Sequence, residues 1–313
     1  MPLDHSADNG IATSRPENSE VGGTETFPFR YCVITAVRDE EQFIGSTIES
    51  MVSQIVKPLE WVIVDDGSKD GSAKIVESYL AQNSWIRLIR RVDRGQRAKG
   101  GGVEAFLEAY STLRSKDWDF LVNLDGDMTF SADYFQKCFE QFREEPALGI
   151  GGGDVYAKMD GNWRPEQPAA YHVRGAAKIY RRQCWDALGG LWPGLGWDTI
   201  DEVKANYLGW RTQSFKTIQL FHHRLSGNRW GGWQFSVMDG EADYVVNYLP
   251  LFFFLKCIRY IFCAPFVVRS VGMMYGYLRG FLRGAPRMEE RELVAYLRGQ
   301  QWRRLFGLSS IWK

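Results

Sequence analysis

The sequence has 313 residues, of which 45% are hydrophobic, so it is long enough to bury one large α/β domain or two smaller ones. Its 38 lysines and arginines balance 38 aspartates and glutamates, so the composition gives no overall signal for nucleic-acid binding. The five cysteines are scattered and odd in number, which argues against a disulfide framework or a cysteine metal site and indicates reduced thiols in a cytosolic protein.

Residues 1–27 are rich in serine, asparagine, glutamate, glycine and threonine and contain few large apolar side chains. A segment of this composition cannot bury enough surface to fold by itself. We therefore predict a disordered leader over 1–27, and because the segment lacks an apolar stretch it does not read as a signal peptide.

From residue 28 the pattern alternates between buried strands and helices. Apolar runs predict strands over 31–37, 61–64, 86–89 and 119–124. Helices are expected from the acidic segment 38–41 onward, after the Asp70–Ser72 cap, and over 103–110 behind a glycine- and base-rich loop at 95–102. This alternation predicts an α/β fold with a doubly wound, mostly parallel sheet.

The second half of the chain has a different composition, and seven of the 12 tryptophans lie between residues 150 and 240. We expect helices over 135–142, near 174–188 and near 200–208, and strands from 148 and over 214–220. The predicted organisation is one domain over 28–240, with a first half (28–130) and a second half (131–240). A helical tail over 241–313 follows.

Three predicted strands end in carboxylates: Asp39 follows the first, Asp66 the second, and Asp125 and Asp127 a later one. The carboxyl ends of parallel strands meet at one edge of a sheet, where ligands bind. Two acids flanking Gly126 at such an edge suit Mg²⁺ or Mn²⁺ holding substrate phosphates. The alternative is a polar turn after a strand.

The loop at 95–102 and its flanks carry Arg94, Arg97 and Lys99. These groups and the loop amides would suit phosphates, although a solvated basic turn is an equal interpretation. The chain contains neither a P-loop nor a dinucleotide-binding glycine motif after the first strand.

The tail is strongly apolar over 248–283 but is interrupted by Lys256, Arg259 and Arg269, so it offers no uncharged membrane span. From residue 256 to the end there are 11 lysines and arginines against three glutamates, a net charge of +8. Two interpretations stay open: C-terminal amphipathic helices on an anionic membrane surface, or a helical hairpin packed on the body.

The segments Val33–Glu40, Val62–Ser68 and Asn123–Asp127, in this order and spacing, resemble the leading motifs of the family-2 inverting glycosyltransferases of the GT-A fold. The resemblance covers residues 30–230 and implies that 28–240 is a glycosyltransferase domain, with 28–130 as its nucleotide-binding half and 131–240 as its acceptor half. It implies that the nucleotide base is held at Thr35, Val37, Asp39, Val64 and Asp66, and that Asp125 and Asp127 bind the ribose and the metal diphosphate. Many members carry proline and an aromatic residue where Thr35 and Val37 stand, so contacts there would come from the backbone.

The resemblance also implies a catalytic base that deprotonates an acceptor hydroxyl. In many members it is an aspartate about eleven residues before a helix-ending glycine, which here gives Asp198, preceded by Trp197 rather than glutamate. Asp201 and Glu202 compete for the role, and helix capping is the structural alternative for the aspartates.

Further candidate site residues lie in or after the segment that contains Asp198. Trp197 would stack on the acceptor sugar, or else be half-buried core. His222 or His223 would complete the metal shell, or else be structural, and Arg224 would contact the diphosphate.

The sequence thus predicts a metal-dependent inverting glycosyltransferase. It would use Mg²⁺ or Mn²⁺ and a UDP- or GDP-sugar, with a saccharide or lipid-linked acceptor, in the cytoplasm or at the inner face of the plasma membrane, in cell-surface polysaccharide or glycolipid synthesis. One alternative is a haloacid-dehalogenase-like phosphohydrolase with Asp125 as nucleophile and Asp127 as acid/base, although such a strand usually opens that fold. The other is a non-catalytic carbohydrate-binding protein.

Overall fold

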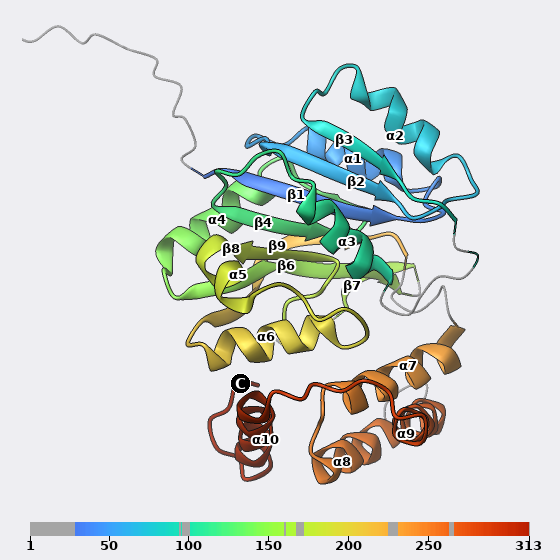
Figure 1. Cartoon of the computed structure of the whole chain (residues 1–313), viewed down its shortest axis with the longest axis vertical. Coiled ribbons are helices and arrows are strands. Elements are labelled where there is room, and N and C mark those ends of the chain that lie inside the picture. Colours follow the sequence, from blue (N-terminus) through green and yellow to red (C-terminus); the bar gives the residue numbers. More distant parts are fainter. Residues whose placement is uncertain are drawn as a thin grey trace, which may run out of the picture.

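The computed structural model describes residues 29–93, 95, 101–159, 161–166, 172–224, 231–262 and 266–312. The predicted leader over 1–27 lies outside the described residues. The described part of the chain forms one nine-stranded sheet with helices on both faces and a helical layer at one end (Figure 1). The strands are β1 (Tyr31–Val37), β2 (Glu60–Asp65), β3 (Ile86–Arg90), β4 (Phe120–Leu124), β5 (Met128–Phe130), β6 (Leu148–Met159), β7 (Asn162–Pro165), β8 (Ala177–Arg181) and β9 (Arg211–His222).

The strand order is β3-β2-β1-β4-β8-β6-β9-β5, with β7 paired to β6. The strands β3, β2, β1 and β4 run parallel, as do β6 and β9, whereas β5, β7 and β8 join in antiparallel pairings. Parallel strands of this kind are apolar on both faces because helices cover both sides. The predicted α/β fold is confirmed.

Alternate residues of β1 enter two different cores. Tyr31 and Val33 join the cluster under α1, α2 and α4, whereas Cys32 and Ile34 join the cluster under α3 and α5. This alternation is the period-two geometry of a strand covered on both sides. The helices are α1 (Ile44–Val52), α2 (Ser72–Leu80), α3 (Gly101–Ser111), α4 (Tyr134–Glu144), α5 (Arg182–Leu188) and α6 (Trp197–Tyr207).

The first helix begins later than the sequence indicated. The acidic segment 38–41 forms turns, and α1 begins only at Ile44 with no acid in its first turn. Asp39 has a positive φ of 54°, a conformation in which a helix cannot start. Acids at a helix start and acids at a ligand-binding turn look alike in sequence, and the turn prevails here.

The helix predicted near 174–188 is wrong in its first half. Residues 177–181 form β8, which pairs with β4 on one side and with β6 on the other, and only Arg182–Leu188 are helical. Ile179 and Tyr180 are buried on opposite faces of the sheet. Tertiary pairing overrides the local helical pattern at this point.

The C-terminal part of the chain forms a layer of four helices: α7 (Gly231–Val245), α8 (Pro250–Ile261), α9 (Val267–Leu282) and α10 (Arg291–Leu305). The layer packs on α6 through a third core that joins Ile200 and Val203 to Phe253, Met273 and Leu297. It lies at the end of the molecule away from β3 (Figure 1). Since α7 spans the predicted boundary at residue 240, the division of the chain into domains stays a prediction.

Among the described residues, none of the helices combines the length and the apolar character needed to cross a bilayer. The described cysteines, Cys32, Cys138, Cys184 and Cys257, are buried free thiols. Burial raises the pKa of Cys32 to about 12.

Candidate functional site

The predicted convergence of strand ends is present in the structure. β1 pairs in parallel with β2 up to Val37 and Asp65, and with β4 on its other side. The Asp66 N–H donates to the Val37 carbonyl at 2.8 Å, and the Asp125 N–H donates to the Ala176 carbonyl at 2.8 Å. The acidic turns therefore leave the sheet at one edge.

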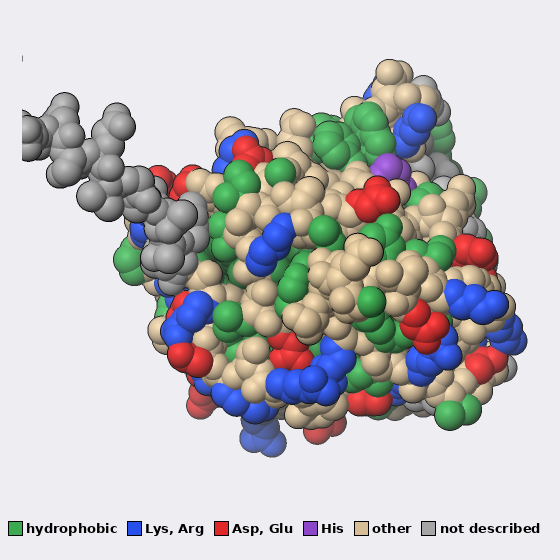
Figure 2. Space-filling model, turned by 90° about the horizontal axis from the view of Figure 1, so that it is seen from above, with side chains coloured by type: hydrophobic (Ala, Val, Ile, Leu, Met, Phe, Trp, Pro, Cys, Tyr) green, Lys and Arg blue, Asp and Glu red, His purple; other side chains and the backbone are tan. Residues whose placement is uncertain are grey.

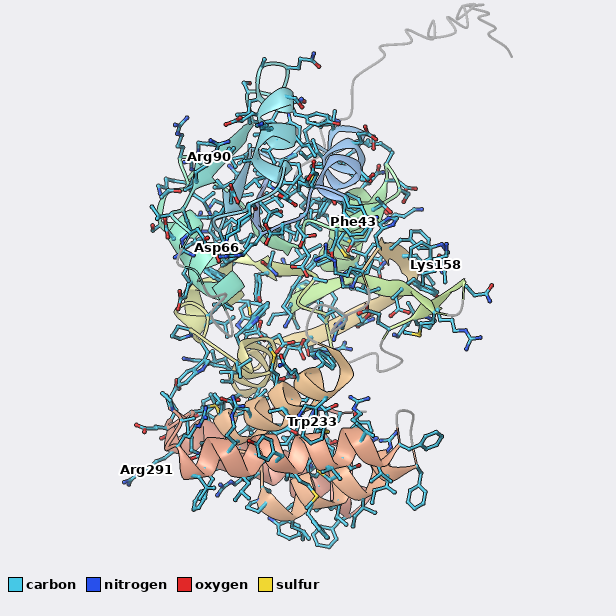
Figure 3. The ribbon with its side chains drawn as sticks, turned by 90° about the vertical axis from the view of Figure 1, so that its right-hand side faces the viewer. Phe43, Asp66, Arg90, Lys158, Trp233 and Arg291 are labelled. Atoms are coloured by element: carbon cyan, nitrogen blue, oxygen red, sulfur yellow. The ribbon has the colours of Figure 1, made fainter. Side chains whose placement is uncertain are left out.

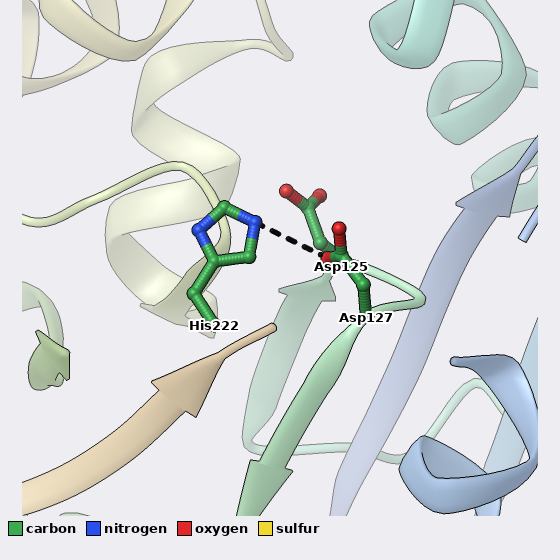
Figure 4. A group of neighbouring side chains, drawn as sticks. All are labelled: Asp125, Asp127 and His222. Carbon is green, nitrogen blue, oxygen red and sulfur yellow. Dashed lines mark ion pairs between the residues drawn. The ribbon is translucent and has the colours of Figure 1, made fainter. Parts of the chain in front are cut away.

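Asp125, Asp127 and His222 form a tight group at this edge (Figure 4). Each offers one ligand atom, and these atoms lie within 4.8 Å of one another. His222 lies beside the two aspartates because β5 and β9 pair antiparallel, which places Met128 opposite His222. Its Nε2 atom lies 3.3 Å from Asp127 Oδ1, and the neighbouring His223 N–H donates to the Asp127 carbonyl at 3.0 Å.

The charges in and around this group favour a bound cation. Burial and the nearby Asp127 raise the pKa of Asp125 to about 6. Burial alone would lower the pKa of His222, but the carboxylates of Asp127 and Glu166 raise it to about 10. Asp127 Oδ1 is buried and, among the described residues, accepts no hydrogen bond of good geometry. Two carboxylates and an imidazole with an unsatisfied buried oxygen fit a divalent cation such as Mn²⁺.

Gly126 permits the tight approach of these two acids to the sheet. A Cβ atom at this position would lie 2.8 Å from Val37 Cγ1 and 3.4 Å from Ile44 Cδ1. The Gly126 carbonyl accepts a hydrogen bond from the buried Thr47 hydroxyl at 2.9 Å. The turn is thus pinned against β1 and α1 by packing and by one buried hydrogen bond.

Asp125, Asp127 and His222 together are called the metal-type group below. Two glutamates that the sequence did not single out lie beside it. Glu166 Oε1 lies 2.8 Å from His222 Nδ1, and its Oε2 lies 3.1 Å from Arg174 Nη2. Glu40 pairs with Arg224 at 2.7 Å. Burial and the charge of Asp127 raise the pKa of Glu40 to about 8. Glu40 stands beside Asp39 in the first motif, but Glu166 follows the exposed β7 and gives no signal in the sequence.

Arg224, predicted as a diphosphate contact, lies on the same side of the site. Besides its ion pair with Glu40, its guanidinium lies 5.1 Å from the centre of the Phe43 ring. His223 also stacks on this ring, with 6.0 Å between the ring centres, and is 2.8 Å from the Thr129 hydroxyl. The His223 side chain therefore contacts Phe43 and Thr129 of β5, whereas His222 belongs to the metal-type group.

The side chains of Thr35, Val37 and Val64 are completely buried. Thr35 Oγ1 accepts a hydrogen bond from the Trp61 indole at 2.9 Å. These three residues can reach a ligand only through their backbone groups, as the departures from the family motif indicated for Thr35 and Val37.

The two aspartates predicted to hold the base lie in adjoining turns. Asp66 Oδ1 pairs with Arg91 Nη1 at 2.7 Å and is buried. The Asp39 side chain is half exposed and accepts a hydrogen bond from the Lys69 N–H at 2.8 Å. Arg97, the other predicted donor contact, lies outside the described residues. Asp39 and Asp66 are thus brought together, and Asp66 has a basic partner already.

The three candidate bases on α6 have different surroundings. The buried Asp201 contacts Lys178 Nζ at 3.1 Å and accepts from the Tyr180 hydroxyl at 2.6 Å. Glu202 is 3.1 Å from the same ammonium, 2.9 Å from His172 Nδ1, and accepts from the Val173 N–H at 2.8 Å.

Asp198 differs from its neighbours. It is half buried, and within the described parts of the chain its carboxylate accepts no hydrogen bond and forms no ion pair. It lines a cavity of about 560 Å³ between α6 and the helical layer, together with Glu166 and Arg174. Glu166 also contacts His222, so one side chain connects this cavity with the metal-type group.

Trp197, the predicted acceptor contact, is not among the described residues that line this cavity. Its half-buried ring lies against Gly175, where a Cβ atom would be only 2.8 Å from Trp197 Cζ2. Lys178 Nζ is 5.3 Å from the ring centre. The ring therefore packs on the loop that precedes β8.

Solved structures with this architecture are GT-A glycosyltransferases. The chain is similar to the mannosyltransferase PcManGT from Pyrobaculum calidifontis in complex with GDP-Man and Mn²⁺, with a TM-score of 0.53 and 15% identity over 91% of this chain and 77% of that one. It is also similar to GalNAc-T7 with UDP, GalNAc and Mn²⁺, with a TM-score of 0.56 and 14% identity over 90% of this chain and 55% of that one. The fold is therefore the GT-A fold.

The sequence comparisons define the family. The family model for glycosyl transferase family 2 matches residues 32–195, more than half of the chain, so the protein belongs to this family. A curated relative, the putative glycosyltransferase EpsH of Bacillus subtilis (strain 168), is 24% identical over 218 residues, covering 62% of this chain and 60% of the relative. The chain spans less than two thirds of the length of the curated relatives it matches first.

The family membership confirms the resemblance drawn from the three motifs. It favours that interpretation over a haloacid-dehalogenase-like phosphohydrolase and over a non-catalytic carbohydrate-binding protein. The order of the strands agrees, because β1, β2 and β3 precede the strand that carries Asp125 and Asp127.

Proposed function

We propose that the protein is a metal-dependent, inverting glycosyltransferase that moves a sugar from a UDP- or GDP-sugar onto a saccharide or lipid-linked acceptor. The proposal depends on one observation: Asp125, Asp127 and His222 lie close together, and Glu166, which contacts His222, also lines the cavity that contains Asp198. The presence of Mn²⁺ with GDP-Man or with UDP in two structures of the same fold supports the choice of donor and metal.

Asp125, Asp127 and His222 would hold the cation, which would supply positive charge to a departing nucleoside diphosphate. Glu166 fixes the orientation of the His222 ring through Nδ1 and leaves Nε2 directed at Asp127. Arg224, held in place by Glu40 and Phe43, adds a cation on the same side. The backbone groups around Val37 and the Asp39 and Asp66 turns would hold the nucleotide.

Asp198 is the base that we propose for the transfer. Its carboxylate would accept the proton of an acceptor hydroxyl as the oxygen attacks the anomeric carbon from the face opposite the diphosphate. The new carbon–oxygen bond forms as the bond from that carbon to the diphosphate oxygen breaks, and the nucleoside diphosphate leaves. Asp201 and Glu202 are poorer bases for this step because Lys178 holds both carboxylates.

The cavity suits a sugar acceptor. Its wall combines acids and bases with the aromatic side chains Phe235, Tyr248 and Trp312. Pockets that bind sugars need both polar groups and apolar faces. We extend the proposal to a role in cell-surface polysaccharide or glycolipid assembly.

Calorimetric titration with a set of UDP- and GDP-sugars in the presence of Mn²⁺ tests the donor site. We expect saturable binding of at least one sugar nucleotide, lost on addition of EDTA and in Asp127→Asn. Asp186→Asn, at an exposed helix position, is the matched control and should bind as the wild type does. Absence of binding for every UDP- and GDP-sugar would refute the proposal, and binding that survives both EDTA and Asp127→Asn would refute its metal-dependent part.

A further inference from the structure

The helices α8 and α9 form a hairpin whose apolar faces point away from the rest of the protein. On α8 the exposed apolar residues follow helical spacing: Leu251, Phe254, Ile258 and Ile261 are 38–51% exposed. On α9 the same pattern recurs at Val267, Val271, Met274, Leu278 and Phe281, which are 47–61% exposed. A soluble helix normally turns its apolar face toward the core.

The charged residues of the hairpin point the other way. Lys256 of α8 pairs with Asp243 of α7 at 2.8 Å. Arg269 and Arg279 of α9 contact Asp239 and Glu241 of the same helix, α7, at 3.5 Å and 3.2 Å. The acids of α7 therefore hold these three cations on the inner side of the hairpin. Apolar side chains lie on both sides of the hairpin, because Phe253, Cys257 and Met273 join the third core on its inner side.

Glycines hold α9 in this orientation. A Cβ atom at Gly276 would lie 2.0 Å from the Val237 carbonyl oxygen, and one at Gly240 would lie 1.9 Å from the Met273 carbonyl oxygen. A Cβ atom at Gly272 or Gly280 would lie 2.7 Å from a side-chain carbon of Ser236 or Tyr244. Rotation of α9 about its axis would replace these glycines with large side chains, so the apolar face cannot turn inward without separating α7 from α9.

The apolar face lies at one end of the molecule. The hairpin is on the side of α7 that faces away from the sheet, and Figure 3 shows side chains projecting from the far side of this layer, with Arg291 at its edge. Figure 2 shows the opposite end, where apolar side chains are interspersed with charged groups of both signs. Exposed apolar side chains that gather into one continuous patch mark a contact site, whereas single ones elsewhere on the surface do not.

The charge of this region selects the partner. Between Asp243 and Glu289 the sequence contains six lysines and arginines and no acidic residue, and three of them, Lys256, Arg269 and Arg279, pair with the acids of α7. Arg259 of α8 and Arg283, directly after the exposed Phe281 and Leu282, are exposed. A second copy of the same face would bring like charges together, whereas anionic lipid headgroups complement them.

We propose that the α8–α9 hairpin is a membrane-docking surface that lies in the interface of an anionic bilayer, with its apolar face among the acyl chains and the arginines at headgroup level. This inference goes beyond the proposed function and does not depend on the chemistry of the metal-type group. The geometry links the two, because Leu255 and Arg259 of α8 also line the cavity that contains Asp198. A surface-bound enzyme would thus present this cavity close to the lipid headgroups.

Vesicle co-sedimentation of the full chain, without nucleotide, tests the proposal. The vesicles are phosphatidylcholine alone and phosphatidylcholine mixed with phosphatidylglycerol. We expect binding to the mixed vesicles, weaker binding to phosphatidylcholine, and a decrease at high salt. The variant Phe254→Ser/Val271→Ser/Leu278→Ser should bind the mixed vesicles about tenfold more weakly or worse, because apolar area and charge act together in interfacial binding.

The matched control is Ile55→Ser/Leu59→Ser/Leu208→Ser, which removes exposed apolar side chains elsewhere and should bind as the wild type does. Thermal unfolding checks that both variants fold. The proposal is overturned if the wild type binds neither vesicle, if it binds both equally, or if the hairpin variant binds unchanged. It is also overturned if light scattering shows a wild-type dimer that the hairpin variant converts to a monomer without any vesicle binding.

Discussion

Glu166 Oε1 lies 2.8 Å from His222 Nδ1, on the side of the imidazole ring opposite to the nitrogen that faces Asp127. The two residues come from segments far apart in the chain, since Glu166 follows β7 and His222 ends β9. A carboxylate in this position fixes the ring of a metal-binding histidine and increases its basicity. Glu166 is therefore a positioning residue for the metal-type group, although it would not touch the metal itself.

The first prediction follows from this contact. Glu166→Gln should weaken Mn²⁺ binding by about ten- to hundredfold, because the orienting carboxylate of a metal-bound histidine has effects of this size. Calorimetric titration with Mn²⁺ measures the change directly, without any turnover. Glu77→Gln, at an exposed surface ion pair, is the control and should bind Mn²⁺ as the wild type does. Equal affinities in wild type and Glu166→Gln would argue against His222 as a ligand.

The second prediction separates the three candidate bases. Asp198→Asn should lower kcat by about a hundredfold to ten-thousandfold, the range typical of a lost general base, while the affinity for the donor stays unchanged. Asp201→Asn and Glu202→Gln should reduce thermal stability instead, because each leaves Lys178 with fewer compensating charges.

A steady-state assay with the best donor from the binding screen, together with thermal unfolding of the three variants, gives the comparison. The opposite result would be a large fall in kcat for Glu202→Gln with normal stability, together with an active Asp198→Asn. This result would assign the base to Glu202, one turn further along α6. The contrast is informative because all three residues lie on the same short helix.

Much of the fold of residues 28–130 could be predicted from sequence. The strands around Val33, Val62 and Leu121 are continuous apolar runs because helices cover both faces of the parallel part of the sheet. The position of Asp125 and Asp127 followed from the same pattern, since a buried strand that ends in acids must place them at the edge of the sheet.

The partners of these acids could not be found in the same way. His222 lies beside Asp127 only because β9 pairs antiparallel with β5, and strand pairing over such a separation leaves no local signal. Glu166 and Arg174 come from segments without regular hydrophobic spacing. Lys178 is completely buried on β8, a strand whose local pattern indicated a helix.

The third prediction concerns the pH dependence of stability. Burial raises the pKa of Asp201 to about 6, although Lys178 and the Tyr180 hydroxyl favour its charged form. The folded state therefore keeps a proton that the unfolded chain releases near the ordinary aspartate pKa of 3.8. The stability contributed by this proton is present below pH 3.8 and falls as the pH rises toward about 6. The free energy of unfolding of the wild type, relative to Asp201→Asn, should fall over this window.

Glu60 provides a control of opposite sign. Burial opposes its ionisation, but the Ser115 N–H and Arg87 outweigh burial and lower its pKa below 4.5. Its contribution is present above pH 4.5 and lost at lower pH. Urea unfolding of wild type, Asp201→Asn and Glu60→Gln at several pH values between about 3 and 7 gives the slopes, below pH 4.5 for Glu60 and between pH 3.8 and about 6 for Asp201. Slopes of the same sign for the two carboxylates would contradict the assignment.

The fourth prediction tests the close contact between α7 and α9. Gly240→Ala places a Cβ atom where the Met273 carbonyl oxygen lies 1.9 Å away, and this neighbour is backbone that cannot rotate aside. Overpacking of this kind costs about 1–3 kcal/mol, so the free energy of unfolding should fall by at least that amount. Gly299, in the interior of α10, has no atom within 4 Å of such a Cβ.

Gly299→Ala should therefore stabilise the protein by about 0.5–1 kcal/mol, because alanine loses less backbone entropy than glycine in a helix. Both variants add one methyl group within a helix of the C-terminal layer, so the pair separates close packing from helix propensity. Urea unfolding of the two variants and the wild type measures both effects. If Gly240→Ala is as stable as Gly299→Ala, then α7 and α9 are not in backbone contact, and the glycines do not hold the apolar face of α9 outward.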